Sequence, residues 1–341
     1  MSFEAVPSVR TRRLTTIEAD SEGDESPDAF ARAVRSGLRS EPKTLPCRYF
    51  YDDRGSRLFE QICDLPEYYL TRTEDAILRD HADAMVAGWV ADPVMVELGS
   101  GSSSKTKRLI AAALRAYGGL HYVPIDVSGA ILEESAEALV RAFPGLRVTG
   151  YAANYRDALA GIARRFDRPK LFVFLGSSLG NYEVEDAVGL LGLLARSMGP
   201  ADRLLLGTDL DKDPATLEAA YDDARRVTAR FNLNILERIN RELGGDFELD
   251  RFRHESRYNA GLRRVEMHLV SRADQEVAIP AAGLTVRLAA GESIHTENSH
   301  KYTPEMLQTL ADRAGFEEEA AWTDRRGQFR VQRWRPAPPT A

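Results

Sequence analysis

The segment ELGSGSSSKT at residues 97–106 contains the residue types that hold a bound nucleotide. It follows the apolar run 93–96 and precedes an apolar, alanine-rich segment, so the pattern predicts a strand, a turn of small residues and a helix. Gly99, Lys105 and Thr106 fit the phosphate loop G-x-x-x-x-G-K-[ST], except that a serine replaces the second glycine. The first question is therefore whether this turn binds a polyanion or another nucleotide-like ligand.

Charges in and after the turn favour a cationic ligand. Glu97 would repel the phosphates of a polyanion, whereas it can help to hold the sulfonium and amino groups of S-adenosylmethionine. Asp126 ends the next predicted strand, where dinucleotide-binding folds place an acid for the ribose hydroxyls. Two alternatives stay open. The run ending at Asp209 resembles a metal-holding strand end of an ATPase, and a glycine turn also serves simple helix–strand packing.

A second polar site follows the buried strand predicted at 170–175. Asn181 and Tyr182 come just after this strand, and ligands bind at the carboxyl ends of strands in open parallel sheets. Such an amide is suited to contact an acceptor nitrogen in an amine methyltransferase. The alternative is that Asn181 only caps a helix beginning near Glu183.

Composition excludes several classes of function. The chain has 341 residues, of which 43% are hydrophobic and 28% charged, and its formal net charge is -7. This balance argues against a nucleic-acid-binding or membrane-binding surface and favours small-molecule chemistry. Cys47 and Cys63 lack the spacing of a zinc site or a disulfide framework, so we expect a cytoplasmic protein. No apolar run approaches the ~20 residues that span a bilayer.

Strand and helix patterns alternate from Val94 to Thr208, which predicts an α/β fold with a doubly wound parallel sheet. Residues 213–245 have a helical period and would form an insertion. Further strands are expected at 264–271 and 284–289, then a helix at 304–314. A hairpin is expected where residues 320–323 and 328–334 pair, so that the sheet has an antiparallel end. We expect residues 1–20 to be a disordered tail and 336–341 a loose one.

Several motifs together resemble the histidine-specific α-N-methyltransferases of ergothioneine biosynthesis. The resemblance runs from about Leu45 to the C-terminal hairpin and rests on these segments: 51–59 (YDDRGSRLF), 65–74 (LPEYYLTRTE), 97–101 (ELGSG), 174–177 (FLGS) with Gly180 and Asn181, 220–223 (AYDD), 228–232 (TARFN), Glu266 with Met267, and 296–299 (TENS). It implies a Rossmann-like class I S-adenosylmethionine-dependent fold with a second α+β domain. That domain would combine 21–72 with 212–301, and the methyltransferase domain 73–211 with 302–335. The implied reaction is trimethylation of the α-amine of L-histidine to hercynine.

The resemblance also implies the site residues. Catalytic residues would be Tyr51, Asn181 and Tyr221, and the histidine-binding residues Tyr68, Asn181, Tyr221, Met267, Glu297, Asn298 and Ser299. A carboxylate and a hydroxyl suit the two ring nitrogens of imidazole. Without the resemblance, residues 292–300 could be an exposed loop, and Met267 and Tyr221 could be core residues.

Cofactor contacts would come from Gly99, Lys105, Asp126, Asn154 and Tyr155. The last two depart from the Asp-Phe pair usual in the family, which leaves affinity for the cofactor open. The histidines at 295 and 300 lack the spacing of a metal site, so we expect no metal. We expect a monomer that acts on L-histidine without nucleic acid or membrane partners. Methylation of tryptophan or tyrosine, a magnesium-dependent small-molecule kinase, and a non-catalytic binding module remain alternatives.

Overall fold

The computed structural model describes residues 14–18, 26–89 and 92–338. Its helices are α1 Pro27–Arg39, α2 Asp53–Cys63, α3 Tyr69–Val86, α4 Lys107–Tyr117, α5 Gly129–Ala142, α6 Tyr155–Arg165, α7 Val184–Ser197, α8 Pro214–Tyr221, α9 Val227–Leu243 and α10 Pro304–Ala314. The 3-10 turns are η1 Cys47–Phe50, η2 Ser178–Asn181, η3 Leu249–Arg251 and η4 Pro280–Ala282.

Fourteen strands are present in the described residues: β1 Leu14–Glu18, β2 Lys43–Thr44, β3 Val94–Leu98, β4 Leu120–Asp126, β5 Leu146–Ala152, β6 Lys170–Phe174, β7 Arg203–Asp209, β8 Phe252–Asn259, β9 Arg264–Ser271, β10 Gln275–Ile279, β11 Leu284–Leu288, β12 Ser293–His300, β13 Phe316–Thr323 and β14 Phe329–Pro336. None of the helices in the described ranges is both long and apolar enough to cross a membrane.

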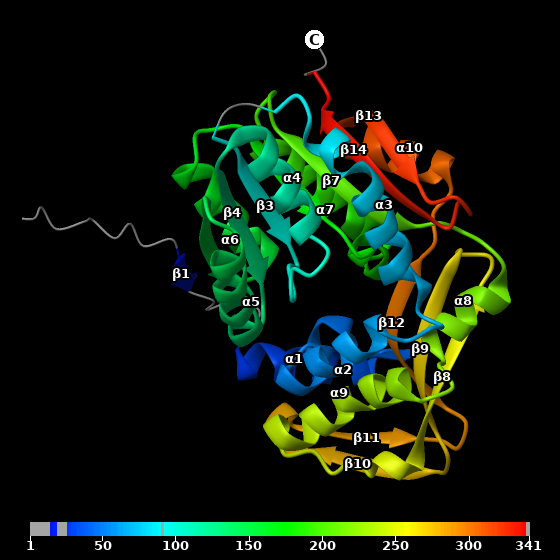
Figure 1. The fold of residues 1–341 in the computed structure, drawn as a ribbon. Coiled ribbons are helices and arrows are strands. Elements are labelled where there is room, and N and C mark those ends of the chain that lie inside the picture. Colours follow the sequence, from blue (N-terminus) through cyan, green and yellow to red (C-terminus); the bar gives the residue numbers. More distant parts are fainter. Residues whose placement is uncertain (1–13, 19–25, 90–91, 339–341) are drawn as a thin grey trace, which may run out of the picture.

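The main sheet has eight strands in the order β1-β5-β4-β3-β6-β7-β14-β13 (Figure 1). Strands β1 and β3 to β7 run parallel, and β14 is antiparallel to both β7 and β13. Helices α6, α7 and α10 bury apolar side chains in one core, and α3, α4 and α5 contribute to another. The predicted Rossmann-like α/β fold, with helices on both faces and an antiparallel end, is confirmed.

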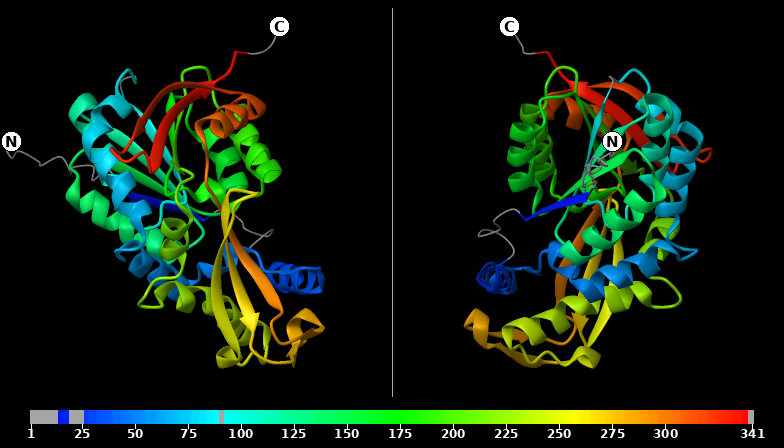
Figure 2. Two further views of the ribbon diagram at one scale, coloured as in Figure 1. Left: turned by 90° about the vertical axis from the view of Figure 1, so that its right-hand side faces the viewer. Right: turned by 60° about the vertical axis from the view of Figure 1, so that its left-hand side comes forward.

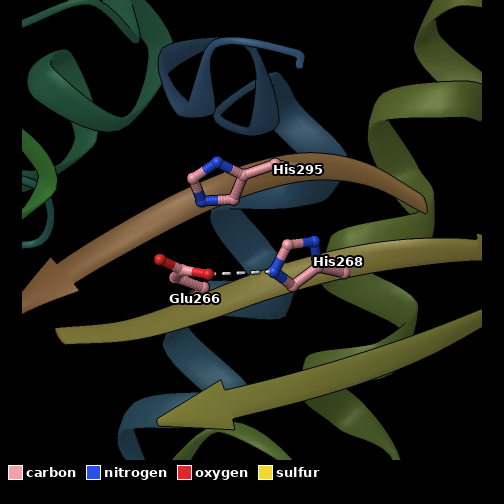
Figure 3. Close-up of side chains that lie close together, drawn as sticks. All are labelled: Glu266, His268 and His295. Carbon is pink, nitrogen blue, oxygen red and sulfur yellow. Dashed lines mark hydrogen bonds and ion pairs between the residues drawn. The ribbon is translucent and has the colours of Figure 1, made fainter. Parts of the chain in front are cut away.

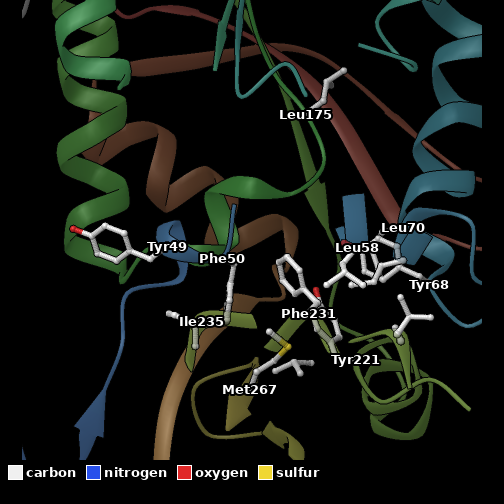
Figure 4. Close-up of a cluster of buried hydrophobic side chains, with 14 of the residues drawn as sticks. Tyr49, Phe50, Leu58, Tyr68, Leu70, Leu175, Tyr221, Phe231, Ile235 and Met267 are labelled. Atoms are coloured by element: carbon white, nitrogen blue, oxygen red, sulfur yellow. The ribbon is translucent and has the colours of Figure 1, made fainter. Parts of the chain in front are cut away.

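A smaller sheet, β2-β12-β9-β8, packs with helices α1, α2 and α9 (Figure 2). The pair β10-β11 lies beyond α9. Buried aromatic and aliphatic side chains join these helices to β9 and to the first residues of α3 (Figure 4). This second group of elements comes from both sides of the chain that forms β3 to β7.

The structure differs from the sequence-based expectations about the elements in four places. Residues 14–18 fall in the tail that we expected to be disordered, but they form β1, which pairs with β5 at the edge of the main sheet. Residues 293–300 form β12 rather than an exposed loop, because they pair with both β9 and β2. Strands β8 and β10 were not predicted. Helix α3 begins at Tyr69, so the boundary expected at residue 72 falls inside a helix.

Candidate active site

The glycine loop follows β3 and turns back on the end of β4. Gly99 and Gly101 have φ values of 67° and 47°, a left-handed conformation that favours glycine. The N–H groups of Gly99 and Ser100 both donate to the carbonyl of Ile125, at 2.9 and 3.1 Å. Asp126 Oδ2 accepts from the N–H of Gly101 at 2.8 Å. The loop and the acid at the end of β4 therefore form one unit.

Two buried hydroxyls beside this unit have no hydrogen-bond partner among the described residues, Ser100 Oγ and Ser128 Oγ. Buried polar atoms in folded proteins are nearly always paired, so unpaired ones next to a loop point to a ligand. Burial raises the pKa of Asp126, although N–H groups including that of Ser128 favour its charged form. These donors and acceptors fit the hydroxyl-bearing ribose of S-adenosylmethionine.

The lysine and threonine of the loop are engaged elsewhere, which decides against a phosphate loop. Lys105 forms an ion pair with Glu74, whose side chain is fully buried and also accepts from the N–H of Gly176. Thr106 Oγ1 donates to the buried carboxylate of Glu97. A phosphate loop needs this lysine on phosphate and this hydroxyl on magnesium. The direct contact expected between Lys105 and the cofactor therefore competes with the Glu74 ion pair.

Glu97 has a structural duty that the sequence did not reveal. Its two carboxylate oxygens accept hydrogen bonds from Thr106 and Tyr122. Burial raises the pKa of Glu97 to about 7, and these two donors oppose the rise. The carboxylate thus joins β3, β4 and the start of α4 behind the glycine loop.

Asn154 and Tyr155 begin α6 at the end of β5. Asn154 is the N-cap residue of α6, and its Oδ1 accepts from the N–H of Asp157 at 3.1 Å. A Cβ atom placed on Gly99 would lie 2.7 Å from the hydroxyl of Tyr155, so the phenol covers the glycine loop. Tyr155 therefore lies beside the glycine loop, and Asn154 precedes it as the N-cap of α6.

Asn181 ends η2, directly after β6. Helix α7 has Glu183 as its N-cap residue and no side-chain cap hydrogen bond, so the helix-capping interpretation of Asn181 is wrong. Next to Asn181, Gly180 packs closely on β12. An added Cβ would lie 3.0 Å from the carbonyl oxygen of His300. The structure thus brings η2, the turn that follows β6, against the strand that carries the predicted substrate-binding residues.

A small apolar cavity gathers four of these predicted residues. Its lining comprises Phe59, Ile62, Tyr68, Ala220, Tyr221, Thr228, Phe231, Met267 and Glu297. Figure 4 shows Tyr221, Phe231 and Met267 close together, with Tyr68 nearby. The volume is about 20 Å³, close to that of one water molecule. The lining side chains must therefore move apart to admit a larger ligand.

Glu297 supplies the carboxyl group of this cavity. Its Oε2 atom is buried and accepts no hydrogen bond from the described part of the chain. Burial raises the pKa of Glu297 to about 8, and the positive charge of Lys301 opposes the rise. An unpaired carboxylate in an apolar pocket is costly unless a ligand supplies a donor.

A β-bulge in β12 determines which side chains face the cavity. His295 pairs with His268 and Glu297 pairs with Met267, so Thr296 is the extra residue. Thr296 Oγ1 donates to Asn232 at 2.7 Å and thereby fixes the bulge on α9. Because side chains alternate after the bulge, Glu297 and Ser299 lie on the side of Met267.

Asn298 lies on the opposite face of this sheet. It pairs with Glu266, and its side-chain amide donates to Glu183 at 2.9 Å. The alternation of the strand therefore turns Asn298 away from the cavity, and its expected contact with the substrate stays a prediction.

Ser299 and Tyr221 meet beside the cavity. Their hydroxyl oxygens are 2.6 Å apart, and Lys301 Nζ donates to both, at 2.8 Å to Ser299 and 3.0 Å to Tyr221. Burial raises the pKa of Tyr221, and Lys301 opposes this rise. Lys301 was not predicted, because a single lysine at the end of a polar segment carries no signal for full burial.

Tyr51 lines a second, larger cavity of about 540 Å³. This cavity lies between the segment after β4, residues 127–129, and residues of α2 and α9. The ring of Tyr51 also packs edge-on against Phe59 and Phe231, which line the small cavity. The side chain of Tyr51 therefore lies between the two cavities.

Glu266, His268 and His295 form a cluster on the face of the small sheet opposite Met267 (Figure 3). The two imidazole rings are stacked, with centroids 5.0 Å apart. Burial lowers the pKa of His268 to about 4, and Arg257 adds to this effect. Glu266 Oε1 accepts from Arg264 at 2.8 Å and Oε2 lies 3.3 Å from His268, so the carboxylate is already balanced by protein groups.

Five lining residues were not predicted as site residues: Phe59, Ile62, Ala220, Thr228 and Phe231. Phe59, Ala220, Thr228 and Phe231 lie within motifs of the resemblance, but apolar helix positions give no sign of a pocket. These residues line the cavity only because α2, α8 and α9 pack together around it.

Comparison with known proteins agrees with this geometry. The family model described as "Histidine-specific methyltransferase, SAM-dependent" matches residues 30–336. The chain is 42% identical over 306 residues to the histidine N-alpha-methyltransferase of Mycolicibacterium smegmatis, which covers 90% of this chain and 94% of the relative. It is 44% identical over 302 residues to the enzyme of the same name from Mycobacterium tuberculosis, covering 88% and 93%. Ergothioneine biosynthesis protein 1 of Neurospora crassa is 32% identical over 83% of this chain and 32% of its own length. The chain belongs to the family of histidine-specific, S-adenosylmethionine-dependent methyltransferases.

Proposed function

We propose that this enzyme transfers three methyl groups in turn from S-adenosylmethionine to the α-amine of L-histidine, giving hercynine for ergothioneine biosynthesis. The observation that carries the substrate assignment is the unpaired, buried carboxylate oxygen of Glu297 in an apolar cavity. A ring that is flat, largely apolar and able to donate one N–H fits both features. The names of the two mycobacterial relatives support the same substrate.

In this proposal the imidazole enters the small cavity. Glu297 accepts a ring N–H, a hydroxyl of the Ser299–Tyr221 pair donates to the other ring nitrogen, and Met267 packs against the ring. Tyr68 and Asn181 hold the backbone groups of the amino acid. Tyr68 is buried and packs edge-on against Tyr221, which supports a place beside the bound amino acid.

The cofactor would be held by the loop at Gly99, by Asp126 on the ribose, and by Asn154 and Tyr155 on adenine. When bound, it supplies a methyl group on a positively charged sulfur. Lys105 would contribute through its ion pair with Glu74, which fixes the loop against the end of β6. No metal is needed for this chemistry, because the leaving group is a neutral thioether.

The acceptor amine must be neutral, because an ammonium group has no lone pair. Tyr51 and Asn181 are proposed to orient the amine, as Tyr51 lies between the two cavities and Asn181 ends η2, the turn that packs against β12. Burial raises the pKa of Tyr51 well above its usual value, and Glu297 adds to this effect. Its phenol therefore stays protonated and orients the amine, while water takes the proton. Positioning and desolvation then matter more than a strong base.

Action as a monomer is part of the proposal. A cytoplasmic location remains part of the proposal. Methylation of tryptophan is the closest alternative, since an indole also offers one N–H to Glu297, but it supplies no acceptor for the Ser299–Tyr221 pair.

The test is a mass measurement of the product formed from L-histidine and S-adenosylmethionine, together with thermal unfolding. We expect a trimethylated product and stabilisation by S-adenosylhomocysteine. Stabilisation by ATP with magnesium instead would restore the kinase alternative.

A further inference from the structure

Lys301 is the residue that follows β12, and its side chain has an exposed fraction of 0%. Its Nζ atom reaches three acceptors: Asp209 Oδ2 at 3.0 Å, Tyr221 Oη at 3.0 Å and Ser299 Oγ at 2.8 Å. An ammonium group has three N–H donors and no acceptor, so each proton has one partner. The three contacts fix the ammonium group completely.

These contacts restrict the two hydroxyls. Both oxygens accept a hydrogen bond from Lys301, so neither hydroxyl proton can point towards it. One of the two hydroxyl protons occupies the 2.6 Å contact between Tyr221 and Ser299. The other hydroxyl proton is free to be donated to a third group. Tyr221 lines the small cavity, so that group can be a ligand in the cavity. The pair is left with one outward hydrogen-bond donor.

We propose that Lys301 is a positioning residue whose ammonium group fixes the hydrogen-bond polarity of the Tyr221–Ser299 pair. This inference rests on the proposed function. Beside Glu297, the cavity then presents one acceptor and one donor. Neutral imidazole has one ring N–H and one ring lone pair, which matches this arrangement. Without Lys301 the two hydroxyls still share a hydrogen bond, but the second hydroxyl proton can turn away from the cavity and leave a lone pair facing it.

The positive charge of Lys301 also acts on Glu297. Although burial opposes the charged form, Tyr221 and Asp209 raise the pKa of Lys301 above its usual range, so the group stays charged. This charge is the influence that favours ionised Glu297 against burial. Lys301 therefore supports both the hydrogen-bond acceptor, Glu297, and the hydrogen-bond donor of the Tyr221–Ser299 pair.

Lys212 provides a matched control. Its Nζ atom donates to Asp209 Oδ1 at 2.6 Å and to the hydroxyl of Tyr69 at 2.7 Å. It shares the carboxylate partner of Lys301 but makes no hydrogen bond to Tyr221 or Ser299 among the described residues. A purely structural role in the Asp209 ion pair would affect both lysines alike.

The experiment compares Lys301→Met, Lys301→Arg and Lys212→Met in steady-state methylation of L-histidine, with binding of S-adenosylhomocysteine measured by calorimetry. We expect Lys301→Met to raise KM for histidine about tenfold or more, with a smaller change in kcat and unchanged cofactor affinity. Lys301→Arg keeps the charge, but its planar guanidinium cannot reach three separate acceptors in the same way, so KM should rise as well. Lys212→Met should leave KM nearly unchanged.

Ser299→Ala and the double variant Lys301→Met/Ser299→Ala complete a cycle. If Lys301 acts through the hydroxyl pair, the double variant loses little more than Lys301→Met alone. Independent, multiplying losses would overturn the proposal, as would a Lys212→Met variant with the same rise in KM. If Lys301→Met does not fold, the Lys301→Arg variant decides: a wild-type KM overturns the proposal. Absence of any histidine methylation by the wild type is a different result, which refutes the proposed function instead.

Discussion

Glu297 on β12 lies directly opposite Met267 on β9, so a carboxylate and a thioether face the same small cavity. The bulge at Thr296 precedes this pair and sets the face of every later side chain in the strand. Substrate recognition therefore depends on a local irregularity of the sheet as well as on the residue types.

The bulge itself can be tested through Thr296. Replacement by valine keeps the shape but removes the donor to Asn232 Oδ1, leaving that oxygen without its partner. We expect a loss of roughly 1 to 3 kcal/mol in the free energy of unfolding, measured by urea denaturation. Thr309→Val is the control, because Thr309 is exposed and donates only within α10. Equal losses in both variants would show that the hydrogen bond at the bulge contributes no more to the free energy of unfolding than an exposed one.

The acid at the end of β4 is expected to serve the cofactor. Asp126→Ala removes charge-assisted hydrogen bonds to the ribose and should weaken S-adenosylmethionine binding by roughly 1 to 3 kcal/mol, measured by calorimetry. Asp324→Ala is the control, since Asp324 also accepts backbone N–H groups but lies in the turn between β13 and β14. Unchanged affinity in Asp126→Ala would remove this residue from the cofactor site.

Asn181 is expected to orient the substrate amine and to make no contribution to cofactor binding. Asn181→Ala should lower kcat/KM for histidine by roughly tenfold or more, because the amine loses an orienting group. Binding of S-adenosylhomocysteine should stay nearly intact, since α7 has its N-cap at Glu183 rather than at Asn181. A parallel loss of methylation and cofactor binding would instead indicate a structural role.

Glu297 should also make stability depend on pH. Its pKa is about 8 in the folded protein, against about 4.3 in an unfolded chain. Between these values the folded state keeps a proton that the unfolded state has released, so stability falls as pH rises. Glu297→Gln removes this titration, and its stability relative to the wild type should increase by roughly 1 to 3 kcal/mol between about pH 5 and about pH 8.5.

Urea denaturation at the two pH values measures this difference. The exposed carboxyl of Glu248 provides the control variant Glu248→Gln. The titratable groups that interact electrostatically with Glu297 are Lys301, Tyr51, Tyr68, Tyr221 and Cys47. If the advantage of Glu297→Gln is the same at both pH values, the carboxyl does not titrate in this range.

The sequence predicted the main sheet well, because strands β3 to β7 are short apolar runs separated by helices with a clear period. The glycine loop and Asp126 also lie at the ends of neighbouring parallel strands as expected, while their contacts with the cofactor stay predictions. Alternating patterns of this kind are local, so they can be recognised without knowing the rest of the fold.

Strand β12 could not be recognised in the same way. Its sequence SIHTENSH is polar on both faces: one face carries the cavity residues and the other carries His295 and Asn298. Its pairing with β9 and β2 is a long-range event, and the extra residue Thr296 reverses the simple alternation. For this reason the sequence does not show that Asn298 faces away from Glu297, and it gives no sign that Lys301 is fully buried.

The measurement that tests the central claim most directly is product mass from histidine, tryptophan and tyrosine with the wild type and Glu297→Ala. We expect the wild type to prefer histidine. Loss of Glu297 should leave a ring N–H unpaired and lower kcat/KM for histidine by roughly 1 to 3 kcal/mol in free-energy terms. Tryptophan should lose less, since the cavity becomes larger and less polar. A wild type that prefers tryptophan, or equal losses on all three substrates in Glu297→Ala, would contradict the assignment of histidine.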